Sequence, residues 1–137
     1  DSLMGCGKTT AIIEWMRMNP TNNYIYISPR LSEVTERIPE GCPELNFKTP
    51  VTSNGVSKSE DMLELLKQGE NIATTHALYQ QLTWQHTQWV ALKGYVLIID
   101  EEGNEKLITA TQNENNIYQK ISEAFNSIIY FKKESKI

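Results

Sequence analysis

Gly94-Tyr95-Val96-Leu97-Ile98-Ile99-Asp100-Glu101 is the stretch that decides the fold, an unbroken apolar run that ends in two carboxylates. A run of this kind, rich in Val and Ile, is typical of a parallel-sheet strand that is buried on both faces. Its acidic end is expected at the carboxyl edge of the sheet, where open α/β folds bind their ligands. There Asp100 is a candidate Mg²⁺ ligand, since Mg²⁺ takes one or two carboxylates together with phosphate oxygens. Glu101 is a candidate catalytic base that orients or deprotonates an attacking water.

A second motif stands near the start of the chain. Gly5-Cys6-Gly7-Lys8-Thr9-Thr10 is followed by an apolar run at residues 11–13, an order typical of a phosphate-binding loop that leads into a helix. The backbone N–H groups of this segment are expected to face an anion. Lys8 is expected to reach the terminal phosphates, and the hydroxyl of Thr9 to ligate Mg²⁺. The pattern departs at one position, because Ser2 stands where a glycine is usual.

Length, composition and charge narrow the class of protein. The 137 residues allow one domain with a substantial core, and 39% hydrophobic and 22% charged residues are ordinary for a globular chain. The net charge of -4 argues against a strong grip on nucleic acid by this chain alone, because free-standing binders usually carry a basic face. Cys6 and Cys42 are too few for a disulfide framework, and no run of about 18 apolar residues could span a membrane. A reducing, cytoplasmic setting is therefore expected.

Strand and helix patterns alternate between the two motifs, which predicts βαβ units and a parallel sheet. Helices are expected at residues 8–18, 31–38, 57–68, 76–82 and 84–92 (the last as a helix or a loose turn), and strands at 24–28, 45–47, 71–74 and 94–99. Ser57 is expected to cap the third of these helices and Gly69 to end it. Residues 117–131 carry apolar side chains at a helical spacing, so a further helix is expected there.

Two polar segments, Ser28-Pro29-Arg30 and Thr74-Thr75-His76, each follow a predicted strand. With them, residues 1–102 resemble the first RecA-like domain of superfamily 2 helicases of the DEAD/DEAH-box type. The chain is more closely similar to the helicase-like proteins of this type that phages encode. The resemblance implies an α/β fold of the RecA-like P-loop NTPase class, with three αβα layers around a mainly parallel sheet.

The resemblance also assigns roles. It implies that residues 5–9 form motif I (Walker A) and that Asp100-Glu101 begin motif II, hence hydrolysis of ATP with Mg²⁺. The two polar segments align with motifs Ia and Ib, which touch the sugar-phosphate backbone in that family. Pro29, Arg30, Thr75 and His76 are therefore candidate nucleic-acid contacts, with DNA favoured over RNA; hydroxyls and arginine suit phosphate contacts that carry no sequence information. Motif II departs from the family after its first two residues, because Glu102-Gly103 follow.

Domain organisation follows from the same resemblance. Residues 1–103 are expected to be the ATP-binding domain, incomplete at its N-terminus because no strand precedes the loop. Residues 104–137 are expected to be a helical extension leading toward a second RecA-like domain missing from this chain. That domain normally supplies arginine fingers, and this chain has only Arg17, Arg30 and Arg37. A first domain alone is expected to bind ATP–Mg weakly, hydrolyse it poorly and unwind nothing; a phage-encoded protein would act in the bacterial cytoplasm.

Two other classes of function remain open at this point. A P-loop nucleoside or nucleotide kinase, such as one resembling thymidine kinase, also combines a phosphate loop with a later Asp-Glu strand end. Kinases of that type usually add a Cys-rich zinc element, which two distant cysteines do not supply. A nucleotide-binding interaction module without turnover is the non-enzymatic alternative. Product analysis separates the first alternative from a helicase-type ATPase, and absence of turnover identifies the second.

Overall fold

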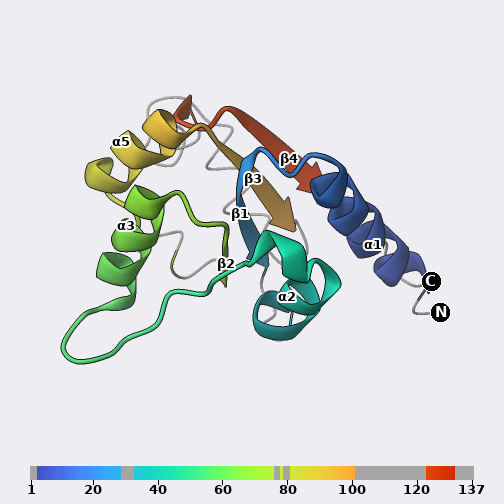
Figure 1. Ribbon diagram of the computed structural model, residues 1–137, viewed down its shortest axis with the longest axis horizontal. Coiled ribbons are helices and arrows are strands. Elements are labelled where there is room, and N and C mark those ends of the chain that lie inside the picture. The colour runs from blue at the N-terminus through green and yellow to red at the C-terminus, as the bar shows by residue number, and fades with distance from the viewer. Residues whose placement is uncertain (1–2, 29–32, 76–77, 79–80, 101–122, 132–137) are drawn as a thin grey trace.

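Four parallel strands form one sheet at the centre of the molecule. The computed structural model describes residues 3–28, 33–75, 78, 81–100 and 123–131 (Figure 1). The strands are β1 (Asn23–Ser28), β2 (Ile72–Thr75), β3 (Tyr95–Asp100) and β4 (Ser127–Phe131), and their order across the sheet is β2-β1-β3-β4. The predicted α/β class with a parallel sheet is confirmed.

Helices cover both faces of the sheet, so the described part of the chain has three layers (Figure 1). Helices α1 (Leu3–Met18) and α2 (Ile38–Gly41) lie on one face, called here the α1 face. Helices α3 (Lys58–Gln68) and α5 (Trp84–Lys93) lie on the other, the α3–α5 face. Successive side chains of a strand point to opposite faces, so each strand supplies both apolar cores. The core of the α1 face includes Met16, Tyr24, Tyr26, Ile38, Val96 and Ile98; that of the α3–α5 face includes Ile25, Ile27, Met62, Leu66, Leu97 and Ile99.

The elements with strong local signals lie where the sequence predicts them. Strands β1, β2 and β3 differ from the predicted ranges by one residue at most at either end. Helix α3 is capped by Ser57, whose hydroxyl accepts the N–H of Glu60 at 3.2 Å while the Glu60 carboxylate accepts the N–H of Ser57 at 2.9 Å. Gly69 ends the helix with φ of 72°, a left-handed conformation that suits glycine. The helix predicted at 84–92 is confirmed as α5.

The segment between β1 and α3 agrees only in part. The helix predicted at 31–38 is present as a π-helical turn, η1 (Glu33–Arg37), that continues into α2. The strand predicted at 45–47 is wrong, because the 3-10 turn η2 (Pro43–Leu45) is followed by Asn46 with φ of 57°, which breaks an extended chain. Lys48 forms a parallel bridge to Ile72 at the outer edge of β2 instead. Most of the helix predicted at 76–82 lies outside the described residues.

Helix α1 begins at Leu3, five residues before the predicted start at Lys8. The backbone of Gly5 to Thr9 is therefore helical, whereas the sequence predicts a phosphate-binding loop there. In an α-helix each N–H bonds to the carbonyl four residues earlier, so the N–H groups from Gly7 onward are engaged within α1. Only the first turn keeps N–H groups that no helical carbonyl accepts. This backbone differs from the anion-facing loop that the motif predicts.

The end of the described chain corrects a second prediction. Residues 127–131 form strand β4 rather than part of a helix, and Ile128 lies in register with Leu97 and Phe131 with Asp100. β-branched and aromatic residues favour a strand, and β3 offers an edge with which they pair. Ile128 also lies three residues after Phe125, a spacing that fits a helix equally well, and for this reason the periodicity was misleading. Residues 127–131 thus belong to the central sheet and not to a helical extension. Of the rest of the segment 104–137, only residues 123–126 are described, and they lie outside the sheet.

Candidate functional site

The strand order singles out one place at the edge of the sheet. The chain passes from β1 to β2 on one side, then crosses back over β1 to β3 on the other. In open α/β sheets ligands bind outside the carboxyl ends of the strands at such a reversal. The three strands that meet there end in Ser28, Thr75 and Asp100. This group of three side chains is the candidate site.

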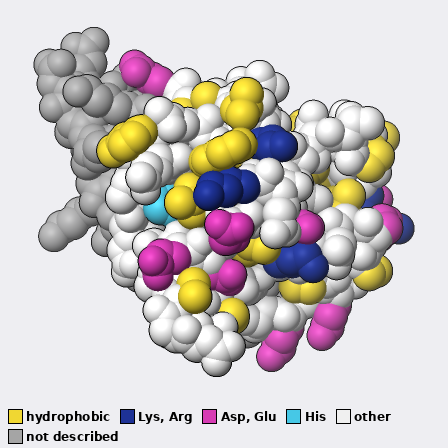
Figure 2. Space-filling view, turned by 60° about the vertical axis from the view of Figure 1, so that its left-hand side comes forward, with side chains coloured by type: hydrophobic (Ala, Val, Ile, Leu, Met, Phe, Trp, Pro, Cys, Tyr) yellow, Lys and Arg dark blue, Asp and Glu magenta, His cyan; other side chains and the backbone are white. Residues whose placement is uncertain are grey.

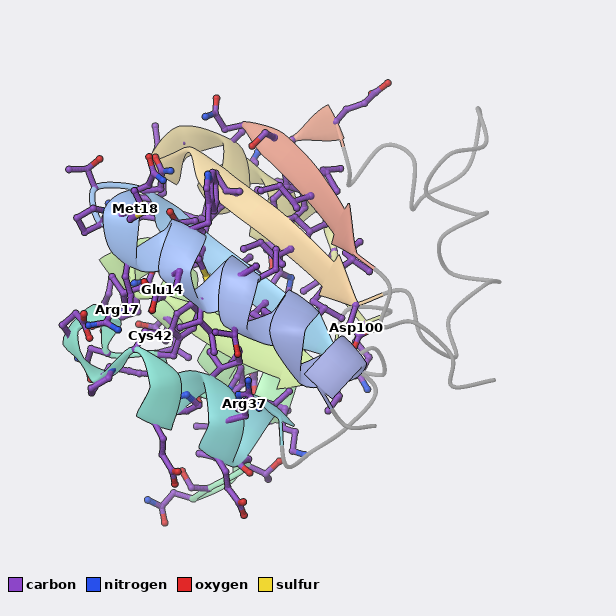
Figure 3. All side chains as sticks on the ribbon, turned by 90° about the vertical axis from the view of Figure 1, so that its right-hand side faces the viewer. Glu14, Arg17, Met18, Arg37, Cys42 and Asp100 are labelled. Carbon is purple, nitrogen blue, oxygen red and sulfur yellow. The ribbon has the colours of Figure 1, made fainter. Side chains whose placement is uncertain are left out.

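The pairing register brings the three strand ends side by side. Ser28 lies opposite Thr75, and the pair Ile27–Ile99 places Ser28 next to Asp100 on the neighbouring strand. Because side chains alternate along a strand, Ser28 shares the α1 face with Tyr26, and Asp100 shares it with Ile98. Figure 3 shows Asp100 at the carboxyl end of β3, on the side of the sheet toward which the N-terminal end of α1 points.

Ser28 and Asp100 are both fully buried, at 0% exposure. The hydroxyl of Ser28 lies 3.5 Å from Oδ2 of Asp100. That separation exceeds the 2.5–3.0 Å typical of an O–H···O hydrogen bond, so the contact is a weak one. A buried carboxylate is usually paired or coordinates a metal. Its position at the carboxyl edge, where the strand order reverses, marks Asp100 as a candidate for function.

The donor set at this edge fits Mg²⁺. Mg²⁺ keeps several waters and is held by one or two carboxylates plus phosphate oxygens rather than by an all-protein cage. Asp100 offers one carboxylate, and Ser28 and Thr75 offer hydroxyls on the adjoining strands. Within the described ranges no group of three or more His, Cys, Asp or Glu side chains could hold a metal by itself.

The predicted site residues fall into three groups. Asp100 and Thr75 lie at the candidate site on the two strands that flank β1. Thr10 lies on α1, exposed, and its hydroxyl accepts a hydrogen bond from Nη2 of Arg37 at 2.9 Å. The others cannot be placed at the site: the side chains of Gly5, Cys6, Gly7, Lys8 and Thr9 and the whole of Pro29, Arg30, His76 and Glu101 lie outside the described residues.

Two residues that contact predicted site residues were missed as individual candidates. The sequence marks Ser28 only as the first residue of a polar segment, because its place beside Asp100 depends on the strand order, which puts β1 next to β3. Arg37 carried no sequence signal, because its bond to Thr10 joins η1 to α1 across 27 residues. Tertiary contacts of that kind leave no trace in local periodicity.

Cys42 and Arg17 belong to a separate, structural part of the α1 face (Figure 3). The thiol of Cys42 is buried and donates to the carbonyl of Ile38 at 3.1 Å, and burial raises its pKa to about 11. Arg17 donates to the carboxylate of Glu44 at 2.7 Å, which raises the pKa of Arg17. Hydrogen bonds from its own backbone N–H and then from Arg17 lower the pKa of Glu44. An exposed pair of this kind contributes little to stability.

His86 is a structural residue. It is buried, and its ring joins the starts of two helices on the α3–α5 face. Nδ1 accepts the N–H of Thr83 at 3.1 Å, so Nε2 carries the proton and donates to the carbonyl of Ser59 at 2.8 Å. Both ring nitrogens are thereby used, and the imidazole has no part in the candidate site.

The surface viewed from the α3–α5 side mixes charges of both signs. Figure 2 shows dark blue Lys and Arg side chains interspersed with magenta Asp and Glu on this face. A nucleic-acid surface normally gathers basic residues on one face, so the described residues visible there do not form one. Across the described residues, no helix combines the length and apolar character needed to cross a bilayer.

Comparison with known proteins finds a phage-related relative. The SPbeta prophage-derived uncharacterized protein YonV of Bacillus subtilis (strain 168) is 36% identical to this chain over 106 residues. The match covers 74% of this chain and 26% of the relative, so this chain spans about a quarter of the relative's length. No family model matches the chain. No solved structure matches it.

Proposed function

We propose that this chain binds and hydrolyses ATP as the first, RecA-like motor domain of a DNA or RNA helicase-like protein of the DEAD/DEAH-box type. Lys8 is assigned to the phosphates, Thr9 and Asp100 to Mg²⁺, and Glu101 to the attacking water. Gly5 and Gly7 allow the backbone to approach the phosphates closely. Mg²⁺, when bound, neutralises charge that develops on the phosphate oxygens.

The observation that carries the proposal is the buried carboxylate at the point where the strand order reverses. Asp100 ends the central strand β3, beside the hydroxyls that end β1 and β2. This is the edge where open α/β folds bind nucleotides. Motif I precedes it along the chain in the order that the helicase family requires. Independent features of sequence and topology thus favour the same edge.

Nucleotide binding on this proposal changes the first turns of α1. The N–H groups of Gly7, Lys8 and Thr9 must leave their helical bonds to face phosphate, so the helix would then begin near Lys8. Opening these turns is favoured by two glycines, each of which costs a helix about 1 kcal/mol relative to alanine. The same opening frees several N–H donors at the positive end of a helix, where an anion is stabilised.

The wider assignment rests on resemblance. YonV is prophage-derived, which supports a phage-type origin and a bacterial cytoplasmic setting for this chain. The relative is about four times as long as the matched region, so a longer protein could contain the second RecA-like domain and its arginine fingers. DNA is the favoured nucleic acid, with Pro29, Arg30, Thr75 and His76 as candidate contacts. Strand separation is proposed only for such a longer protein.

Nucleotide binding by the purified chain tests the proposal. A fluorescent ATP analogue should bind in the presence of Mg²⁺, and Lys8→Ala should lose that binding. Lys67→Ala is the matched control, because Lys67 is an exposed lysine on α3 that pairs with Glu64 of the same helix. Unchanged binding in Lys8→Ala would remove the phosphate-site assignment. Products then decide the class: free phosphate stimulated by DNA fits the motor domain, a phosphorylated nucleoside fits a kinase, and no turnover fits an interaction module.

A further inference from the structure

We propose that Ser28 is the positioning residue for the Mg²⁺-binding carboxylate of Asp100. This inference rests on the proposed function, and it assigns to Ser28 a role distinct from the nucleic-acid contacts of its neighbours Pro29 and Arg30. Ser28 does not touch phosphate in this proposal; it acts on metal binding through the orientation of Asp100.

The two residues form a polar end to otherwise apolar strand faces. Along the α1 face, β1 presents Tyr24 and Tyr26 before Ser28, and β3 presents Val96 before Ile98 and Asp100. The polar pair is 0% exposed at both positions. An apolar residue at position 28 would extend the core by one more layer, but the chain has a hydroxyl there, and this hydroxyl lies beside the carboxylate that ends the adjoining strand.

The geometry suits orientation rather than neutralisation. The Ser28 hydroxyl lies 3.5 Å from Oδ2 of Asp100. An ionised carboxylate has about four acceptor positions on its two oxygens, so a bond from one hydroxyl occupies only one of these positions. A short shift toward the typical 2.7–2.8 Å would make this a full hydrogen bond. Such a bond to one oxygen fixes the plane of the carboxylate and so the direction of the other oxygen.

The orientation of a ligating carboxylate affects its affinity for a metal ion. Ligating carboxylates are themselves hydrogen-bonded, and loss of such a partner typically costs about 10–100-fold in metal affinity. Ser28→Ala should therefore raise the Mg²⁺ concentration for half-maximal ATP binding by about tenfold. Binding of ATP in excess EDTA should stay as in the unsubstituted chain, because the phosphate contacts of Lys8 are untouched. A general loosening of the fold would weaken both.

Thr74 provides the matched control. It is buried at the same edge of the sheet, one residue before Thr75, but its side chain lies on the α3–α5 face. Thr74→Val removes a hydroxyl that is about as buried as that of Ser28, without affecting Asp100. Ser28→Cys fills the space of the serine side chain but replaces the hydroxyl with a thiol, which is a weak hydrogen-bond donor. This variant is used instead of Ser28→Ala if Ser28→Ala does not fold.

The experiment titrates Mg²⁺ against a fluorescent ATP analogue for each variant, with unfolding curves as a check on the fold. The proposal expects a tenfold shift in the Mg²⁺ midpoint for Ser28→Ala or Ser28→Cys, none for Thr74→Val, and unchanged metal-free binding throughout. A midpoint within twofold of the unsubstituted chain overturns the role of Ser28 and leaves the proposed function standing. If the unsubstituted chain shows no Mg²⁺-dependent binding, the proposed function fails, and this inference fails with it.

Discussion

The two faces of the sheet are built differently. The α3–α5 face is closed by two amphipathic helices whose ends are fixed by Ser57, Gly69 and Gly94. The α1 face has an equally apolar centre, but at the carboxyl edge it ends in the buried polar pair Ser28 and Asp100. The same strands thus serve stability on one side and a candidate site on the other. Substitutions on one face should therefore affect stability alone, and those at the edge of the other should affect ligand binding.

The largest expected loss of stability lies in the α3–α5 core. Leu66 is fully buried there, so Leu66→Ala should lower the free energy of unfolding by about 3 kcal/mol, through lost transfer energy and a residual cavity. Urea unfolding measures this. Leu92→Ala is the control, because Leu92 on α5 is 71% exposed and should change the value by no more than about 0.5 kcal/mol. Equal losses in the two variants would contradict the assigned packing.

A smaller loss of stability is expected when the hydrogen bonds of His86 on that face are removed. His86→Phe removes the acceptor of the Thr83 N–H and the donor to the Ser59 carbonyl, leaving two partly buried backbone groups without these partners. The cost should be about 2 kcal/mol, while the Mg²⁺ midpoint for ATP binding stays unchanged. Gln88→Ala, on the exposed side of the same helix, should have almost no effect. A shift of the Mg²⁺ midpoint in His86→Phe would show that the two faces are coupled.

The smallest effect concerns Cys42 and alkaline pH. Burial raises the pKa of this thiol to about 11, so folding favours the neutral form. The stabilisation is complete below about pH 9 and is lost as pH rises toward 11. The melting temperature of the unsubstituted chain should accordingly fall more steeply over this range than that of Cys42→Ser. Parallel slopes would mean that the thiol is less buried than the packing indicates.

The sequence predicts the parts of the fold whose signals are local. Signals of a few residues predict these elements: the apolar runs predict β1 and β3, and Ser57 and Gly69 predict the two ends of α3. Strand β4 was missed because Ile128 fits a helical and an extended spacing alike, and only pairing with Leu97 decides between them. The early start of α1 was missed because a motif predicts a ligand-bound backbone, whereas helical bonding satisfies the same N–H groups within the chain.

Part of the candidate site could be predicted from the sequence, and part depends on tertiary packing. Asp100 and Thr75 could be assigned to one edge, because parallel strands place their carboxyl ends together. Ser28 as the neighbour of Asp100 depends on strand order, which places β1 between β2 and β3. The contact from Arg37 to Thr10 depends on the path of η1 over α1. Such contacts are set by tertiary packing, which local sequence patterns do not encode.

The most direct test of a nucleotide-phosphate site at this edge is the Mg²⁺ dependence of ATP binding in Asp100→Asn. Asparagine keeps the size of the side chain and removes its charge. Asp61→Asn is the control, because Asp61 lies on α3, where it accepts the N–H of Val51. The predicted result is that Asp100→Asn retains metal-free ATP binding, loses its enhancement by Mg²⁺, and still unfolds cooperatively. Enhancement by Mg²⁺ equal to that of the unsubstituted chain and of Asp61→Asn would contradict the site.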